Sequence, residues 1–210
     1  MKTKLFLILP LIALFAFTGC NEDDTVMESQ YKRENNFNKP GDDTILDIAL
    51  AGGFNELAKA IGYVDEKLDA GLGAAISSNE IQLTVFAPID DAFFALYDVL
   101  GPDVTEITDI PAETVLAVLQ YHLTNGRRGS NSVVPRNGEK RIQTLLNRAS
   151  FTVNSDSMIT PAGGATKLVD GQGEVVPTVQ IGELGPETFN ISASNGIVHV
   201  IDAVLLPPSE

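Results

Sequence analysis

The most constraining feature of this chain is a nearly continuous apolar run close to its C-terminal end, Ile197 to Leu206. A run without alternation between apolar and polar residues is typical of a strand that is covered on both faces. The dipeptide Asn195-Gly196 before it favours a tight hairpin turn with positive φ, and Pro207-Pro208 ends it. We therefore expect a central strand here, and we expect its removal to unfold the domain.

A second apolar segment, Thr84 to Pro88, is β-branched and aromatic, which is typical of a buried strand. Pro88 has no backbone N–H and therefore ends the strand. Asp90 or Asp91 then supplies the N-cap of a helix that continues with Ala92-Phe93-Phe94. The segment predicts a strand, a proline, a cap and a helix in that order, and we expect this strand to pack against the C-terminal one.

The first half of the chain has the periodicity of helices, and the second half has the composition of strands. Thr44 can cap a helix from Ile45 to Leu50, and apolar residues recur at three- and four-residue spacing between Phe54 and Ile61. Pro111 suits the first turn of a further helix. Helices followed by strands, without regular alternation, predict an α+β fold. The further strands are expected at residues 150–153, 174–176, 178–181 and 189–191.

Together, the segments Thr84–Asp90 and Asn195–Pro207 resemble the two signature segments of the fasciclin-like domain family. A Tyr-His pair that closes a helix in this family is matched by Tyr121-His122. Ile89 departs from the family's pattern, which has Thr before the capping Asp. The resemblance covers roughly Asp43 to Pro207, and it implies N-terminal helices packed on a C-terminal β-sandwich or wedge.

The resemblance also implies a non-catalytic adhesion or interaction module that binds protein or glycan. In animal members of the family, the region around the Tyr-His pair is linked to integrin adhesion, so Tyr121 and His122 are candidate contact residues. Asp90 and His199 are expected to be structural parts of the two motifs. The alternative function is a structural accessory subunit of an envelope or glycan-uptake complex.

His122 and His199 are the two histidines of the chain and the first residues to consider for catalysis. His199 lies within the apolar strand, which favours a hydrogen-bonded structural imidazole over a general base. His122 follows Tyr121 at a helix end, which favours a packed pair over a binding role. The sequence contains no nucleophile elbow, zinc-binding His-Glu-x-x-His motif, cysteine pair or phosphate loop. We therefore expect no enzyme activity, no metal and no cofactor.

Two weaker patterns involve carboxylates. The loop Asp170–Glu174 faintly resembles a calcium loop but lacks the alternating oxygen ligands, so a Gly-rich turn is favoured. The adjacent pair Asp90-Asp91 would suit a hydrolase only with two carboxylates about 5–10 Å apart in a cleft. Helix capping and the helix dipole explain this pair better.

The N-terminus has the features of a bacterial lipoprotein signal peptide. Two lysines precede an apolar run, Leu5 to Phe17, which is shorter than a membrane-spanning helix of about 20 residues. The sequence Phe17-Thr18-Gly19-Cys20 resembles a lipobox, although it has Phe where Leu is usual. We expect residues 1–19 to be removed and Cys20 to carry lipid that holds the protein on a membrane durably. An incidental cysteine beside an ordinary signal peptidase site is the alternative.

An acidic, polar segment at residues 20–42 is expected to be a flexible tether for one domain at residues 43–210. The cluster Glu22-Asp23-Asp24 resembles the export signal of surface lipoproteins in Bacteroidota, and a plain acidic tether is its other explanation. We expect an outer-membrane lipoprotein exposed at the cell surface, with the periplasmic face as the alternative. The net charge of −14 argues against nucleic acid and against adsorption to anionic lipid, so the lipid anchor is the expected membrane contact.

Overall fold

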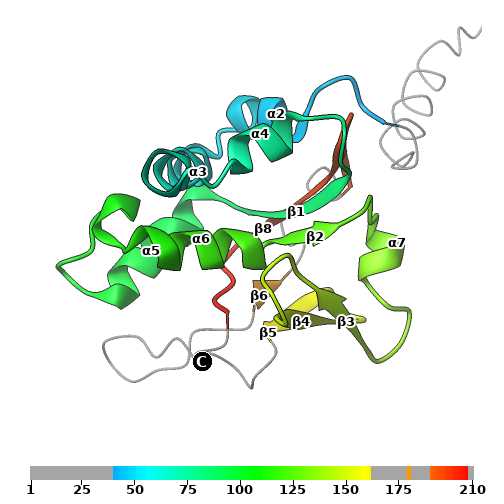
Figure 1. Ribbon diagram of the computed structural model, residues 1–210. Coiled ribbons are helices and arrows are strands. Elements are labelled where there is room, and N and C mark those ends of the chain that lie inside the picture. The colour runs from blue at the N-terminus through cyan, green and yellow to red at the C-terminus, as the bar shows by residue number, and fades with distance from the viewer. Residues whose placement is uncertain (1–39, 162–178, 181–189, 208–210) are drawn as a thin grey trace, which may run out of the picture. The chain divides into compact units, whose positions relative to one another are not determined.

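The structure is a computed structural model that describes residues 40–161, 179–180 and 190–207 (Figure 1). The strands are β1 Leu83–Pro88, β2 Leu123–Asn125, β3 Glu139–Gln143, β4 Ser150–Asn154, β5 Met158–Pro161, β6 Val179–Gln180, β7 Ile191–Ala193 and β8 Gly196–Ile201. Within these residues, one sheet has the strand order β2-β1-β8-β7 and the other has the order β3-β4-β5-β6. The expected signal peptide, most of the tether and the expected strand at 174–176 lie outside the described residues.

The described helices lie mainly before the strands in the sequence, which confirms the α+β class. They are α2 Ile45–Ala51, α3 Asn55–Leu68, α4 Leu72–Ser77, α5 Asp90–Leu100, α6 Ala112–Tyr121 and α7 Ser130–Val133, with a 3-10 turn η1 at Ile107–Asp109. Thr44 caps α2, as expected, through a reciprocal pair with Asp47. The Asp47 N–H donates to Thr44 Oγ1 over 3.2 Å, and the Thr44 N–H donates to the Asp47 carboxylate over 3.0 Å.

The centre of the first sheet consists of the two apolar segments identified in the sequence. Strands β1 and β8 run parallel, with Leu83 opposite Gly196 and Pro88 opposite Ile201. Every residue of both strands is buried, as continuous apolar runs require. Strands β2 and β7 pair antiparallel with them on the outer sides. The predictions that these segments are buried strands, that they pack together and that the C-terminal strand is central are confirmed.

Strand β8 is shorter than expected because its partner ends. Pro88 has no N–H to continue the ladder, and α5 begins two residues later. The Ile89 N–H therefore makes the last bond of the pair, to Ile201 O over 3.1 Å. The apolar run was expected to continue as a strand to Leu206, but it leaves the sheet as an irregular C-terminal segment, residues 202–207.

The turn before β8 also differs from the expected one. A hairpin connects β7 to β8, but its loop residues are Ser194 and Asn195, and neither Asn195 nor Gly196 has positive φ. The predicted positive-φ turn at Asn195-Gly196 is therefore wrong. Gly196 is required for a different reason, because a Cβ at this position would lie 2.0 Å from the Leu83 carbonyl oxygen of the paired strand.

Asn195 joins three segments that are distant in the sequence. Its side chain is fully buried and accepts a hydrogen bond from the Ile45 N–H at the start of α2 over 2.9 Å. Its Nδ2 donates to Ile76 O over 2.7 Å and to Ser78 O over 3.0 Å at the end of α4. The hairpin is thereby fixed to two helices through one amide side chain.

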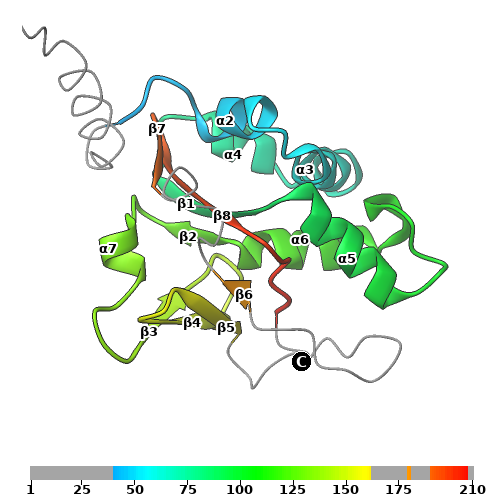
Figure 2. The same cartoon turned by 180° about the vertical axis from the view of Figure 1, so that it is seen from behind.

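The two faces of the first sheet contribute to separate cores. Val85 and Val198 point toward the helices, whereas Phe86 and Ile201 belong to the core shared with the second sheet. Alternate residues of a strand face opposite sides, which explains this division. Figures 1 and 2 show α2, α3 and α4 on one side of the first sheet and the second sheet on the other. The N-terminal helices therefore pack on one side of a two-sheet arrangement, as the fold prediction states.

Residues 41–43 run along the outer edge of β7. The Gly41 N–H donates to Ala193 O over 3.2 Å, and the Ser194 N–H donates to Asp43 O over 2.7 Å. An edge strand presents unpaired backbone groups, and this segment satisfies part of them.

Candidate functional site

Asp90 does not cap its own helix. It is the first residue of α5, and Ile89 occupies the cap position with extended backbone dihedral angles and no side-chain cap bond. The Asp90 carboxylate instead accepts hydrogen bonds from the Glu56 N–H and from Asn55 Nδ2, each over 2.9 Å. Both groups belong to the first turn of α3, whose cap residue has no side-chain cap bond. The prediction that Asp90 or Asp91 caps α5 is therefore wrong, because the extended cap conformation falls one residue earlier.

The carboxylate of Glu56 extends this network into the interior. Its residue is only 4% exposed, and it accepts hydrogen bonds from the Tyr97 hydroxyl over 2.9 Å and from Lys59 Nζ. Burial, reinforced by the hydrogen bond to Glu56, raises the pKa of Tyr97 far above its usual value. The carboxylates of Asp90 and Glu56 thus hold α3 against α5. For Asp90, this supports a structural role and not a catalytic one.

Tyr121 and His122 close α6, as expected, but both side chains are buried. The Tyr121 hydroxyl donates to Ser150 O over 2.8 Å and its ring packs edge-on against Phe151. The His122 Nε2 accepts from the Leu205 N–H over 2.9 Å, so its Nδ1 carries the proton and donates to Val118 O over 2.7 Å. Burial lowers the pKa of His122 to about 4, and the bond to Val118 partly opposes this. The pair therefore fastens α6 to β4 and to the C-terminal segment.

This placement bears on the expected contact role of the pair. Tyr121 is 0% exposed and His122 is 2% exposed. As folded, neither side chain reaches the surface, so their placement does not support direct contact with a partner.

His199 is fully buried in the centre of the first sheet. Its Nε2 donates to Arg128 O over 2.8 Å, and its ring stacks on Phe86 with centroids 5.5 Å apart. Burial lowers the pKa of His199 to about 4, opposed in part by the bond to Arg128. The His199 Nδ1 accepts from the Asn190 N–H over 3.5 Å, so both ring nitrogens are bonded to backbone groups, as expected for a structural imidazole. The Thr84–Asp90 segment contributes the stacked ring of Phe86.

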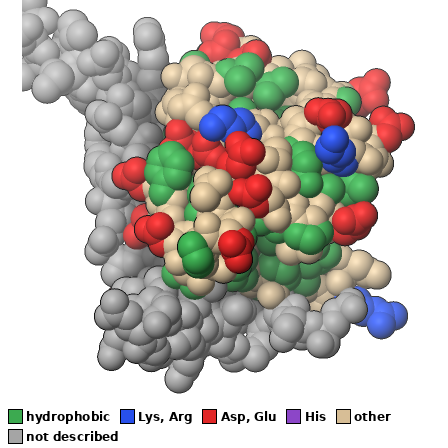
Figure 3. Space-filling model, turned by 90° about the vertical axis from the view of Figure 1, so that its left-hand side faces the viewer, with side chains coloured by type: hydrophobic (Ala, Val, Ile, Leu, Met, Phe, Trp, Pro, Cys, Tyr) green, Lys and Arg blue, Asp and Glu red, His purple; other side chains and the backbone are tan. Residues whose placement is uncertain are grey.

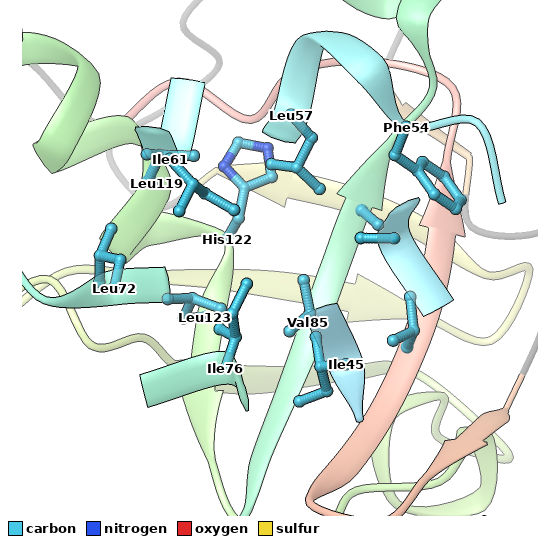
Figure 4. A pocket seen from close by; sticks show the side chains of 13 residues that line it. Ile45, Phe54, Leu57, Ile61, Leu72, Ile76, Val85, Leu119, His122 and Leu123 are labelled. Atoms are coloured by element: carbon cyan, nitrogen blue, oxygen red, sulfur yellow. The ribbon is translucent and has the colours of Figure 1, made fainter. Parts of the chain in front are cut away.

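A small apolar cavity of about 20 Å³ lies between the helices and the first sheet (Figure 4). Figure 4 shows the His122 ring near Leu57 and Leu119 at one end of this cavity. The lining is apolar apart from His122, whose two nitrogens are already bonded. This cavity is a packing feature of the core, and the described residues that line it offer no free polar group to orient a ligand.

A larger groove, of about 750 Å³, lies between α5, α6 and the C-terminal segment. It shares Leu57, Leu119 and His122 with the small cavity, so these three side chains form the wall between the two spaces. The remaining lining side chains are mostly aliphatic or aromatic. They are Ala60, Pro88, Phe93, Leu96, Leu100, Ile107, Ile110, Glu113, Thr114, Val115, Ala117, Val118, Val204, Leu206 and Pro207.

Sequence reasoning did not identify this groove, although one pattern pointed to it. Between α5 and α6 the chain is polar, except that Val104, Ile107 and Ile110 recur every three residues. Apolar residues at such regular spacing within a polar connection indicate that the connection lies over an apolar surface. Ile107 and Ile110 indeed line the groove.

Across the part of the chain that the structure describes, no group of three or more His, Cys, Asp or Glu side chains could hold a metal ion. In the same part, no helix has both the length and the apolar character needed to cross a membrane. Cys20, the cluster Glu22–Asp24 and the loop Asp170–Glu174 lie outside the described residues, so the expectations for them stay predictions.

Comparison with known proteins gives a family match over most of the chain. The fasciclin domain model matches residues 53–207. Protein sll1483 of Synechocystis sp. is 29% identical over 174 residues, which are 79% of this chain and 74% of that protein. The fasciclin-like arabinogalactan protein elcF of Phaeosphaeria nodorum is 28% identical over 127 residues, which are 60% of this chain but only 37% of that protein. A solved FAS1 domain pair from the insect cell adhesion molecule fasciclin I is 18% identical, with a TM-score of 0.48, and the match covers 74% of this chain and 46% of the insect chain.

Proposed function

Because this chain belongs to the fasciclin domain family, we propose that it is a non-catalytic interaction module that a lipid on Cys20 presents at a bacterial cell surface. Domains of this family are generally cell-adhesion and interaction modules, and they are typically found outside cells or on their surfaces. The family match over residues 53–207 is the observation that carries the proposal. The proposed ligand is a protein or a glycan.

The chemistry of the described residues supports a role without catalysis. Both histidine rings are buried and hydrogen-bonded to backbone groups, and burial lowers the pKa of each to about 4. A neutral ring that is already bonded and excluded from the surface is poorly suited to proton transfer with a substrate. The Asp90 and Glu56 carboxylates are likewise engaged in holding two helices together.

The charge of the chain supports a partner that is not itself acidic. The net charge is −14, and Figure 3 shows acidic side chains spread over one face of the domain with few basic ones among them. Like charges on a partner would repel this surface at long range, whereas basic or neutral partners would not. A neutral glycan or a basic protein surface therefore fits better than a polyanion.

The test compares host strains that lack the gene, carry it, or carry Cys20→Ala. Adhesion to immobilised glycans and proteins should be lost in the first strain, restored in the second and not restored in the third. The released Cys20→Ala protein, added from outside, should compete with adhesion by the complemented strain.

A different pattern would favour the accessory-subunit alternative. In that case the strain lacking the gene adheres normally but takes up a glycan poorly, and the protein copurifies with a membrane transport complex. Adhesion that persists without the gene would overturn the proposed function.

A further inference from the structure

We propose that the groove between α5, α6 and the C-terminal segment binds a neutral amphiphile, with an apolar body and a hydrogen-bond-donating end group such as a hydroxyl. This inference is independent of the adhesion role. It rests on the size of the groove, the chemistry of its walls and the charge at its rim.

The size of the groove matches that of small-molecule sites. Its volume is about 750 Å³, and ligand pockets in proteins occupy about 300–1,000 Å³. The groove is open to solvent, so the size range of ligand sites applies to it and the rule for voids in packed interiors does not. The adjoining cavity between the helices and the first sheet is only about 20 Å³.

The walls of the groove favour an apolar body. Aliphatic side chains from α3, α5, α6 and the C-terminal segment face the groove, and Leu100 at its edge is 47% exposed. Figure 3, which views the domain from the side of α3 and α5, shows hydrophobic side chains gathered in the lower half of that face. Covering such a wall with an apolar ligand gains about 25 cal/mol per Å² of apolar surface removed from water.

The polar groups of the groove are few, and they decide which end group fits. His122 is neutral and both of its nitrogens are bonded, so it offers neither a charge nor a free donor. Glu113 and Thr114 are exposed in the first turn of α6, at the rim. Glu113 is the charged side chain among the described residues of the lining, and it already supplies the negative charge that a helix N-terminus favours. A ligand carboxylate would meet like charge there, whereas a hydroxyl can donate to Glu113.

The experiment uses the mature chain, residues 20–210 with Cys20→Ala, and the fluorescent probe N-phenyl-1-naphthylamine, which is neutral, apolar and carries one N–H donor. Saturable binding with a single site per chain is expected. Decanol and decanoate, which have ten carbon atoms each, then compete for the probe at physiological ionic strength. Decanol should compete better by about tenfold because of the charge on Glu113, and Glu113→Gln should reduce that preference.

Two substitutions place the probe in the groove. Ala117→Phe on α6 fills the groove and should weaken probe binding by about tenfold or more. Ala95→Phe is the matched control, because Ala95 is exposed on α5 and is not among the residues that line the groove. Leu100→Gln, at a half-exposed edge position where folding tolerates a polar side chain, should also weaken binding.

The outcomes separate clearly. Loss of probe binding in Ala117→Phe and Leu100→Gln, with wild-type binding in Ala95→Phe, supports the site. The proposal is overturned by probe binding that does not saturate, by equal effects of Ala117→Phe and Ala95→Phe, or by decanoate competing as well as decanol. It is also overturned if sedimentation shows a dimer that Ala117→Phe dissociates, because a second copy then occupies the groove.

Discussion

The substitution Asp90→Ala tests whether one carboxylate joins two helices. It removes the acceptor for the Glu56 N–H and for Asn55 Nδ2, each bonded over 2.9 Å. Loss of a helix cap costs about 1 kcal/mol, and loss of a negative charge from a first helical turn costs about 0.3–1 kcal/mol. Because Asp90 caps α3 and also lies in the first turn of α5, we expect the free energy of unfolding to fall by about 2 kcal/mol.

The neighbouring residue provides a matched control. Asp91 is exposed in the same first turn of α5, so Asp91→Ala removes the charge near that helix N-terminus without touching α3. It should cost about 0.5 kcal/mol. Asp90→Asn retains one acceptor oxygen and should recover part of the loss. Urea unfolding gives the free energy of unfolding of all three variants, provided that the m-value does not change. Thermal midpoints should shift by about 2–4 °C per kcal/mol for a chain of this size.

Equal losses for Asp90→Ala and Asp91→Ala would refute the reasoning, because the bonds to α3 would then contribute nothing. A double-mutant cycle with Asn55→Ala gives a second check. Since Asn55 Nδ2 bonds directly to Asp90, the two substitutions should couple by about 0.5 kcal/mol or more. Amide hydrogen exchange at Glu56 should accelerate in Asp90→Ala but not in Asp91→Ala.

Three further predictions concern other parts of the chain. Gly196→Ala should destabilise the domain by about 3 kcal/mol or more, because its Cβ would lie 2.0 Å from a strand carbonyl oxygen. The control is Gly62→Ala, at a helical position with open space, which should raise the free energy of unfolding by up to about 1 kcal/mol. Urea midpoints measure both variants. His122 and His199 have pKa values of about 4 when folded against about 6.5 when unfolded. The unfolded chain therefore binds more protons as pH falls from about 6.5 toward 4, so stability should decline across that window, and urea midpoints that stay constant between about pH 6.5 and 5 would contradict this. Cys20→Ala should move the protein from the membrane fraction to the soluble fraction, and retention of the variant on membranes in cell fractionation would exclude the lipid anchor.

Parts of the fold that neighbouring residues determine can be predicted from the sequence. The two central strands can be recognised as apolar runs, and Thr44 caps α2 through Asp47, a residue three positions away. Strand β3 could not be found in this way, because only Ile142 of its residues is buried and the apolar pattern is too weak. The expected strand at 189–191 is shifted to Ile191–Ala193, where pairing with β8 decides its position.

The candidate site is harder to predict because its contacts join distant segments. Asp90 bonds a residue 34 positions away, and Asn195 bonds one 150 positions away. Both residues also fit a local rule, a helix cap and a tight turn, and the local rule gave the wrong role. The Tyr121-His122 pair was located correctly, but its burial depends on Ser150 and Leu205, which only the tertiary structure brings together.

The pairing of residues 41–43 with the hairpin has a mechanical consequence. Any pull on the chain ahead of residue 40 reaches the domain first at Gly41, whose N–H is bonded to Ala193 O, and next at Asp43, whose carbonyl accepts from the Ser194 N–H. Tension is therefore carried into the β7–β8 hairpin, which Asn195 ties to α2 and α4. The force therefore acts on the hairpin and on the hydrogen bonds of Asn195 before it acts on a helix. In a pulling experiment, substitution of Asn195 should lower the unfolding force more than substitution of any residue of α5.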